Sequence, residues 1–174
     1  MFRTPSLHWS SSLFYLFLIF ISVIVAVMGS LLLIRFLTHK RIDVKEEIVQ
    51  NCNLGIALVL ASFIWTIGSM ALETIRPIMN AWYGSFADGG VQMPGLGVFL
   101  SKVFGAMMMA LIIGAFTVMM ALKVLMVINR DINEWEEIKG GNTAVAVVMA
   151  VTVTLSGLFF QSVVSYIVVN LFGI

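Results

Sequence analysis

The sequence predicts an all-α membrane protein of four transmembrane helices, built as two parallel two-helix repeats with a pseudo-twofold axis along the membrane normal. Two observations lead to this fold class: four long apolar runs, and a pattern of charged and small residues that recurs along the chain. Of the 174 residues, 60% are hydrophobic and only 11% are charged, whereas about a quarter of a soluble domain is charged. The few polar residues cannot cover the apolar surface in water. The lipid bilayer is therefore the expected environment.

A helix needs about 20 apolar residues to cross the hydrocarbon core, and the four runs that meet this length cover residues 13–34, 54–72, 103–122 and 143–172. The first run is longer than the apolar core of a signal peptide, about 7–15 residues, so we expect it to be retained. Pro77 is expected to end the second helix. The predicted divisions are an N-terminal segment (1–12), a first repeat (13–79), a Gly-rich loop (80–97) and a second repeat (98–174).

The distribution of basic residues predicts the orientation. Four spans place both termini on one side of the membrane and the first and third loops on the other. Seven of the ten basic residues flank those two loops, namely Arg35, Lys40, Arg41, Lys45, Lys123, Arg130 and Lys139. The other side has Arg3, Arg76 and Lys102. Because cytoplasmic loops carry an excess of Lys and Arg, we expect both loops in the cytoplasm and both termini outside.

An internal repeat appears when the chain is shifted by 89 positions (142 − 53). Arg41 then falls on Arg130, Glu47 on Glu136, and Asn53 on Asn142. Each unit reads as an apolar helix, a short charged loop, and an Asn followed by a helix that carries small residues. Two spans per unit give both copies the same orientation, unlike inverted repeats, whose axis lies in the membrane plane.

Small residues at helical spacing predict close helix packing. In the second and fourth spans the small residues are spaced by four and then seven positions, and in the third span by four and four. Each spacing places the small residues on one stripe of its helix. Such stripes let helix backbones approach in lipid. They indicate either packing within the bundle or a subunit interface, and they comprise Ala57, Ala61, Gly68, then Ala146, Ala150, Gly157, and Ala106, Ala110, Gly114. Asn53 and Asn142 stand just before their helices and are predicted caps.

The second copy of the motif also resembles a known family. From Trp135 to Ala146 the chain reads Trp-Glu-Glu-Ile-Lys-Gly-Gly-Asn-Thr-Ala-Val-Ala, which resembles the YjfL-like family of bacterial inner-membrane proteins. In the first copy the tryptophan is absent, and Asn51, Cys52 and Asn53 replace the Gly-Asn form. The resemblance covers most of the chain from about residue 13. It implies a tandem two-span repeat and a bacterial inner membrane, and it implies no activity.

Two groups of polar residues in the spans are candidate pathway residues. Glu73 and Arg76 lie near the far end of the second span, where they form either a self-paired interfacial couple or a proton or ion site. Thr154, Gln161 and Ser165 share one face of the fourth span. These three form either interhelical hydrogen bonds or a hydrated path, since polar groups need partners in hydrocarbon.

The third loop is a candidate docking site for a partner. It is acidic, and Trp135 within it is either an interfacial anchor or a contact for a cytoplasmic protein. A solvated face is the simpler interpretation of the acidic residues, and a divalent-cation site is the alternative. The candidate residues are Arg130, Asp131, Glu134, Trp135, Glu136 and Glu137.

No catalytic or metal-binding motif occurs in the sequence, so we expect no enzyme, no cofactor and no metal centre. A net charge of +1 gives no reason to expect a nucleic-acid partner. The predicted function is a non-enzymatic subunit of the bacterial inner membrane. It would oligomerise, or dock a membrane-protein partner, through its helix stripes and acidic cytoplasmic loops. The alternative is a small ion channel or transporter, formed by a homo-oligomer with a path along the fourth helix.

Overall fold

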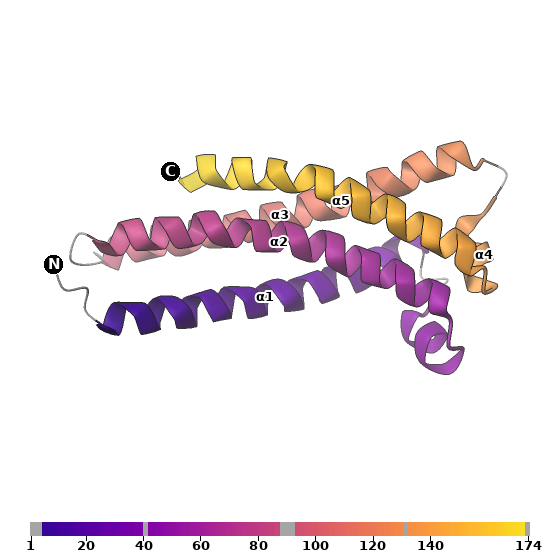
Figure 1. Cartoon of the computed structure of the whole chain (residues 1–174), viewed down its shortest axis with the longest axis horizontal. Coiled ribbons are helices and arrows are strands. Elements are labelled where there is room, and N and C mark those ends of the chain that lie inside the picture. Colours follow the sequence, from indigo (N-terminus) through magenta and orange to yellow (C-terminus); the bar gives the residue numbers. More distant parts are fainter. Residues whose placement is uncertain (1–4, 40–41, 88–92, 131, 173–174) are drawn as a thin grey trace.

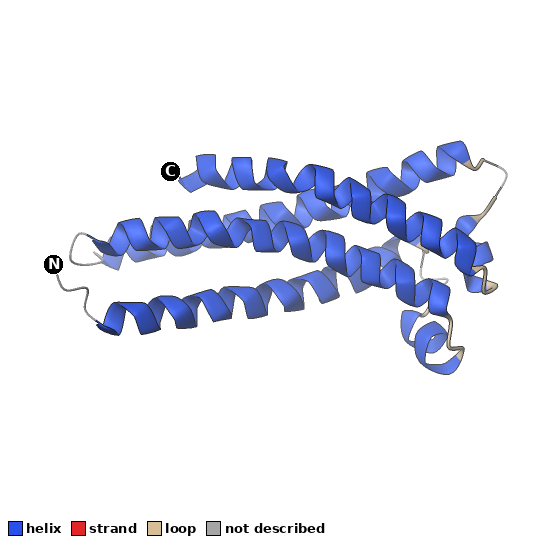
Figure 2. Cartoon of the chain, in the orientation of Figure 1, coloured by secondary structure: helices blue, strands red, loops and turns tan. Residues whose placement is uncertain are grey.

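The computed structural model describes residues 5–39, 42–87, 93–130 and 132–172. This part of the chain is helical, with no strand in the residues described (Figure 2). The long helices are α1 (Pro5–Leu37), α2 (Leu54–Ala87), α3 (Met93–Ile128) and α5 (Thr143–Phe172). A π-helical turn, η1 (Glu46–Gln50), and a short helix, α4 (Glu134–Lys139), lie in the connections. The predicted all-α fold with four long apolar helices is confirmed.

Each long helix contains a stretch apolar enough to cross a membrane: Ser11–Leu37, Leu54–Tyr83, Gly95–Ile128 and Thr143–Leu171. These stretches have 27, 30, 34 and 29 residues. At about 1.5 Å per residue each is longer than the roughly 30 Å of hydrocarbon that it must cross. The helix ends therefore extend into the headgroup region, and the four helices define a multipass membrane protein.

The four helices are not arranged equally around a centre (Figure 1). α2 lies between α1 and α5, and its most extensive packing is against α5. α1 packs on α2, and α3 packs on both α5 and α2, whereas α1 and α5 do not pack extensively against each other. η1 and α4 lie together at the end of the bundle opposite the start of α1 and the end of α5 (Figure 1).

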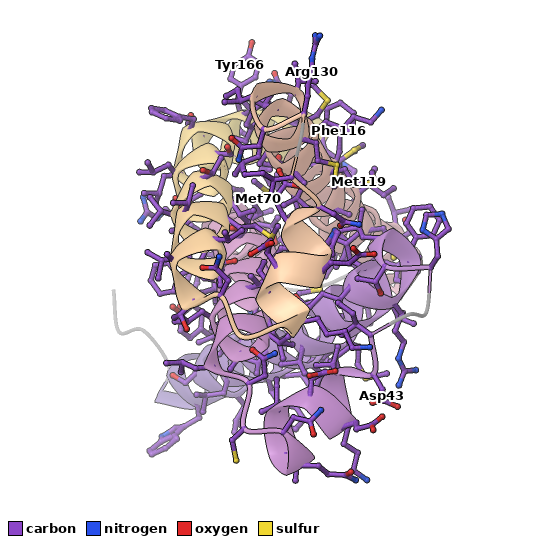
Figure 3. All side chains as sticks on the ribbon, turned by 90° about the vertical axis from the view of Figure 1, so that its right-hand side faces the viewer. Asp43, Met70, Phe116, Met119, Arg130 and Tyr166 are labelled. Atoms are coloured by element: carbon purple, nitrogen blue, oxygen red, sulfur yellow. The ribbon has the colours of Figure 1, made fainter. Side chains whose placement is uncertain are left out.

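Two clusters of buried apolar side chains stabilise the bundle. One lies toward η1 and α4 and includes Phe63 of α2 and Ile138 of α4, both fully buried. The other includes Leu18, Met70 and Val164 from three helices. Viewed from the α4 end, Met70 lies among the helices, while Arg130 and Tyr166 point outward (Figure 3). The remaining apolar surface faces outward, as expected for helices that contact lipid.

The second helix does not end at Pro77, and this prediction was wrong. α2 continues through the proline to Ala87, and α3 already begins at Met93. The predicted loop 80–97 is therefore helical at both ends, and its residues 88–92 lie outside the described part. The ring of Trp82 stacks on Phe14 of α1 at 4.3 Å and lies 5.6 Å from Phe99 of α3. These contacts, together with burial of Pro77 itself, favour a continuous helix over a break at the proline.

Candidate functional sites

Small residues bring α2 and α5 together at two points. A Cβ atom on Gly157 of α5 would lie 2.8 Å from Cγ2 of Thr66 in α2. In the same place the Thr66 hydroxyl donates a 3.3 Å hydrogen bond to the Val153 carbonyl of α5. Nearer the loops, a Cβ on Gly55 would lie 3.2 Å from Cβ of Ala146. The two backbones are thus as close as small residues allow, which matches the use of such residues between membrane helices.

The structure places most of the predicted stripe residues inside the bundle. Ala106, Ala110 and Gly114 of α3 are buried, and a Cβ on Gly114 would lie 3.3 Å from the Ile67 backbone of α2. Gly68 faces α1, where its Cβ would meet Ala26 at 3.4 Å. Among the nine stripe residues only Ala61 is exposed; Ala146 and Gly157 are buried, and Ala57, Gly68 and Ala150 are half-buried. The buried members of these stripes therefore lie at contacts within the chain, whereas Ala61 does not.

The two asparagines make the same local hydrogen bonds. The Asn53 side-chain oxygen accepts the Ile56 N–H at 3.2 Å, and that of Asn142 accepts the Val145 N–H at 3.4 Å. This is the geometry of a helix N-cap. Each asparagine follows a residue with positive φ, +49° at Cys52 and +91° at Gly141. Both helices thus begin directly after a left-handed turn.

The turns preceding the asparagines differ by one residue. The Asn142 N–H bonds the Glu137 carbonyl and the Gly141 N–H bonds the Ile138 carbonyl, which is a Schellman motif. The Asn53 N–H instead reaches the carbonyl of Glu47, six residues back, because η1 is a π-helical turn. Glu137 and Glu47 hold equivalent places in these two turns. The 89-residue shift aligned Glu47 with Glu136, so the alignment is one residue off before the turn.

Asn53 also joins the two loop regions. Its side-chain N–H groups lie 3.0 Å from the Ile138 carbonyl and 3.3 Å from the Lys139 carbonyl, at the end of α4. Asn142 has no such long-range bond and donates to Glu137 in its own loop at 2.9 Å. The contact holds α4 against the start of α2. It was not predicted, because nothing in the sequence relates residue 53 to residues 138 and 139.

The acidic loop is less solvated than its composition indicates. Arg130, Glu136 and Glu137 are exposed, but Glu134 is only 3% exposed, and its Oε1 has no hydrogen-bond partner in the described residues. Asp131 lies outside the described residues. Glu134 precedes the fully buried Ile138 by four residues, so both are on the inner face of α4. That spacing was the available signal that Glu134 points inward. Trp135 is half-buried, and its indole N–H is likewise unpartnered.

The polar residues of α5 separate into two groups. Thr152, Ser156, Ser162 and Asn170 bond carbonyls of their own helix. The predicted pathway residues Thr154, Gln161 and Ser165 are all half-buried, and no side-chain hydrogen bond joins them to another described residue. In hydrocarbon such groups are costly unless they meet water or a partner.

Glu73 and Arg76 do not form the interfacial couple that their spacing favours. Glu73 is half-buried and Arg76 is exposed, and no ion pair links them within the described part of the chain. Arg76 instead lines a surface groove with residues of α1.

The described residues contain no group of three or more His, Cys, Asp and Glu side chains that could hold a metal ion. The fold and these sites define a multipass α-helical membrane protein. In comparisons with known proteins, no family model, no curated protein and no solved structure matches the chain. The resemblance to the YjfL-like family therefore stays a prediction.

Proposed function

We propose that the chain is a non-enzymatic membrane subunit that associates with a second copy of itself through the outer face of α5. The observation that carries the proposal is the row of Thr154, Gln161 and Ser165, which has no partner within the described chain. The fourth span is also the least enclosed: 22% of its most apolar window is buried, compared with 50% for the second span.

The chemistry of Gln161 suits contact between identical helices. A primary amide has both a donor and an acceptor, so two copies facing each other satisfy one another without a different partner. Hydrogen bonds between membrane helices contribute about 0.6–2 kcal/mol each. Thr154 and Ser165 lie seven and four residues from Gln161 and extend the same face.

The unequal packing of the helices supports this choice of face. Under the predicted repeat, α1 and α2 correspond to α3 and α5. The packing of α3 on α2 would then have a counterpart of α1 on α5, but α1 and α5 do not pack extensively in the described chain. The matching caps at Asn53 and Asn142 support the repeat and its pseudo-twofold axis. A neighbouring subunit on α5 would cover the face that α1 leaves open.

We also propose a bacterial inner membrane, with the η1 and α4 end in the cytoplasm. The asymmetry of basic residues and the family resemblance support this location. The exposed residues Arg130, Glu136 and Glu137 would then offer a charged surface to a cytoplasmic partner.

The test is resonance energy transfer between labelled copies in vesicles, measured against the protein-to-lipid ratio. We expect Gln161→Leu to weaken association about 3- to 30-fold, the equivalent of the hydrogen bonds lost. Asn170→Leu is the matched control, because Asn170 is also an amide on α5 but already bonds the Tyr166 carbonyl. Equal effects of the two substitutions, or no association at any density, would contradict the proposal.

A channel or transporter is the second candidate, because the same three residues would line a hydrated path in a homo-oligomer. Ion and proton flux into the same vesicles separates the two functions. Flux that Gln161→Leu abolishes while energy transfer is unchanged would favour transport. Absence of flux together with weakened association would favour the subunit.

A further inference from the structure

A groove between α1 and α2 has the character of a lipid site. It has a volume of about 630 Å³, and its lining includes Tyr15 and Leu16 of α1 and Leu72, Arg76, Asn80 and Tyr83 of α2. The α2 residues Leu72, Arg76, Asn80 and Tyr83 follow one another at intervals of four, four and three, so they form one stripe along the helix. The groove follows this stripe and lies between α1 and α2, which run antiparallel (Figure 1).

The groove lies where a membrane changes from hydrocarbon to headgroups. Arg76 is 22 residues beyond Leu54, about 33 Å along α2 from the loop end. On α1, Tyr15 is 20 residues before Arg35, or about 30 Å. Both distances match the thickness of the hydrocarbon core, about 30 Å. Tyr15 and Arg76 therefore lie together at the interface on the side where α1 begins.

The polar groups of the groove have unused hydrogen-bonding capacity. Arg76, Asn80, Tyr15 and Tyr83 form no side-chain hydrogen bond and no ion pair with any other described residue. Arg76 and Asn80 are exposed, and the tyrosines are 45% and 49% exposed, so all four are accessible from the membrane surface. Together they offer a guanidinium fork, two phenol hydroxyls and an amide to one ligand. Arginine is the side chain whose fork matches the oxygens of a phosphate.

The exposed apolar residues of the groove lie on the side nearer the bilayer centre, and its other apolar residues are buried beneath the polar groups. Leu72 is one helical turn deeper in the membrane than Arg76, and it is 48% exposed. Leu16 of α1 also lines the groove and is 61% exposed, while Ile75 and Met79 are buried. The groove is therefore polar at the surface and apolar toward the bilayer centre, which is the order of groups in a phospholipid.

We propose that this groove binds one glycerophospholipid, with its phosphodiester on Arg76 and an acyl chain along Leu16 and Leu72. Tyr15, Tyr83 and Asn80 donate hydrogen bonds to the phosphate or the adjoining esters. The site is separate from the α5 face and does not depend on the assembly proposed for it. An arginine that merely extended into the headgroups would use neither tyrosine and would not distinguish one lipid from another.

The test is native mass spectrometry of the full chain in maltoside detergent, titrated with dioleoyl phosphatidylglycerol. We expect one tightly bound lipid, and about tenfold or weaker binding for Arg76→Gln, since hydrogen bonds to charged groups are the strong ones. Arg35→Gln is the matched control, because Arg35 is an exposed arginine at the other end of α1. Arg76→Lys keeps the charge without the fork and should fall between wild type and Arg76→Gln.

Three results would overturn the proposal. One is an equal loss of lipid affinity for Arg76→Gln and Arg35→Gln. Another is that dioleoylglycerol, which lacks the phosphate, binds as tightly as the phospholipid. The third is displacement of the lipid by millimolar inorganic phosphate, which would assign the site to a soluble anion. Should Arg76→Gln lose its fold, as judged by circular dichroism, Tyr83→Phe carries the test. It removes one hydroxyl, and a several-fold loss is expected, whereas unchanged binding would refute the site.

Discussion

Substitution of Gly157 by alanine tests whether the contact between α2 and α5 organises the bundle. The new Cβ would lie 2.8, 3.0 and 3.2 Å from Cγ2, Oγ1 and Cβ of Thr66. The nearest of these distances is 0.6 Å short of the 3.4 Å at which ordinary contact begins. Threonine is branched at Cβ, and in a helix its side chain has few alternative rotamers. We therefore expect the helices to separate locally rather than the side chain to move aside.

Two opposing terms set the size of the effect. Overpacking a well-packed contact typically costs about 1–3 kcal/mol. Alanine in place of glycine within a helix returns up to about 1 kcal/mol. The net destabilisation is thus about 0–3 kcal/mol, and the single substitution alone does not isolate the clash.

Comparison with Gly105→Ala and a double-mutant cycle isolate the clash. No atom lies within 4 Å of a Cβ built on Gly105 of α3, so this control reports the helix term alone. The two alanine variants should differ by about 1–3 kcal/mol. In a Thr66→Ala background the penalty at Gly157 should shrink, because the two closest atoms are removed and only the 3.2 Å approach to Cβ remains. That background itself loses the bond to Val153, about 0.6 kcal/mol.

The measurement is the free energy of unfolding in mixed micelles, obtained by titration with dodecyl sulfate and followed by circular dichroism. Equal stabilities for Gly157→Ala and Gly105→Ala would refute the reasoning. So would a coupling energy of zero between positions 66 and 157, because it would mean that the two helices do not meet there.

Two further predictions concern the loop end of the bundle. Asn53→Ala should destabilise the chain by about 2 kcal/mol and Asn142→Ala by about 1 kcal/mol in the same unfolding assay. Both variants lose a helix cap, but only Asn53 also donates to the Ile138 carbonyl. A larger loss of stability for Asn142→Ala than for Asn53→Ala would show that this link is unimportant. The second prediction concerns topology and uses Cys52, which is exposed. An impermeant maleimide should label Cys52 from one side of the membrane only. A Cys52→Ser variant that carries Glu136→Cys should be labelled from that same side. Labelling from opposite sides would contradict a four-span topology.

The sequence was sufficient for properties that depend on neighbouring residues. Hydrophobic length alone located four helices, and the fourth begins at Thr143 as expected, because Asn142 caps it and the chain runs apolar from there. The prediction failed at Pro77, where a local rule for helix termination was overruled by distant contacts. Trp82, five residues beyond the proline, is held by aromatic rings of two other helices.

The candidate sites show the same division. The spacing of Ala106, Ala110 and Gly114 predicted a close contact, but only the fold showed that α2 occupies it. The hydrogen bond from Asn53 to α4 joins residues that are 85 positions apart in the chain. Glu134 is buried in that same short helix.

The sequence by itself determined that the chain enters lipid, how many helices cross it and where the capped helices begin. These properties follow from hydrophobicity and hydrogen bonds between residues close in the chain. Only the tertiary structure decided which faces are used inside the bundle, and that Thr154, Gln161 and Ser165 of α5 make no side-chain hydrogen bond to the other residues that the structure describes. It also decided that Arg76 and Tyr15 line the same groove. In lipid all spans are about equally apolar, so which helix packs against which depends on shape, and shape is set by residues far apart in the chain.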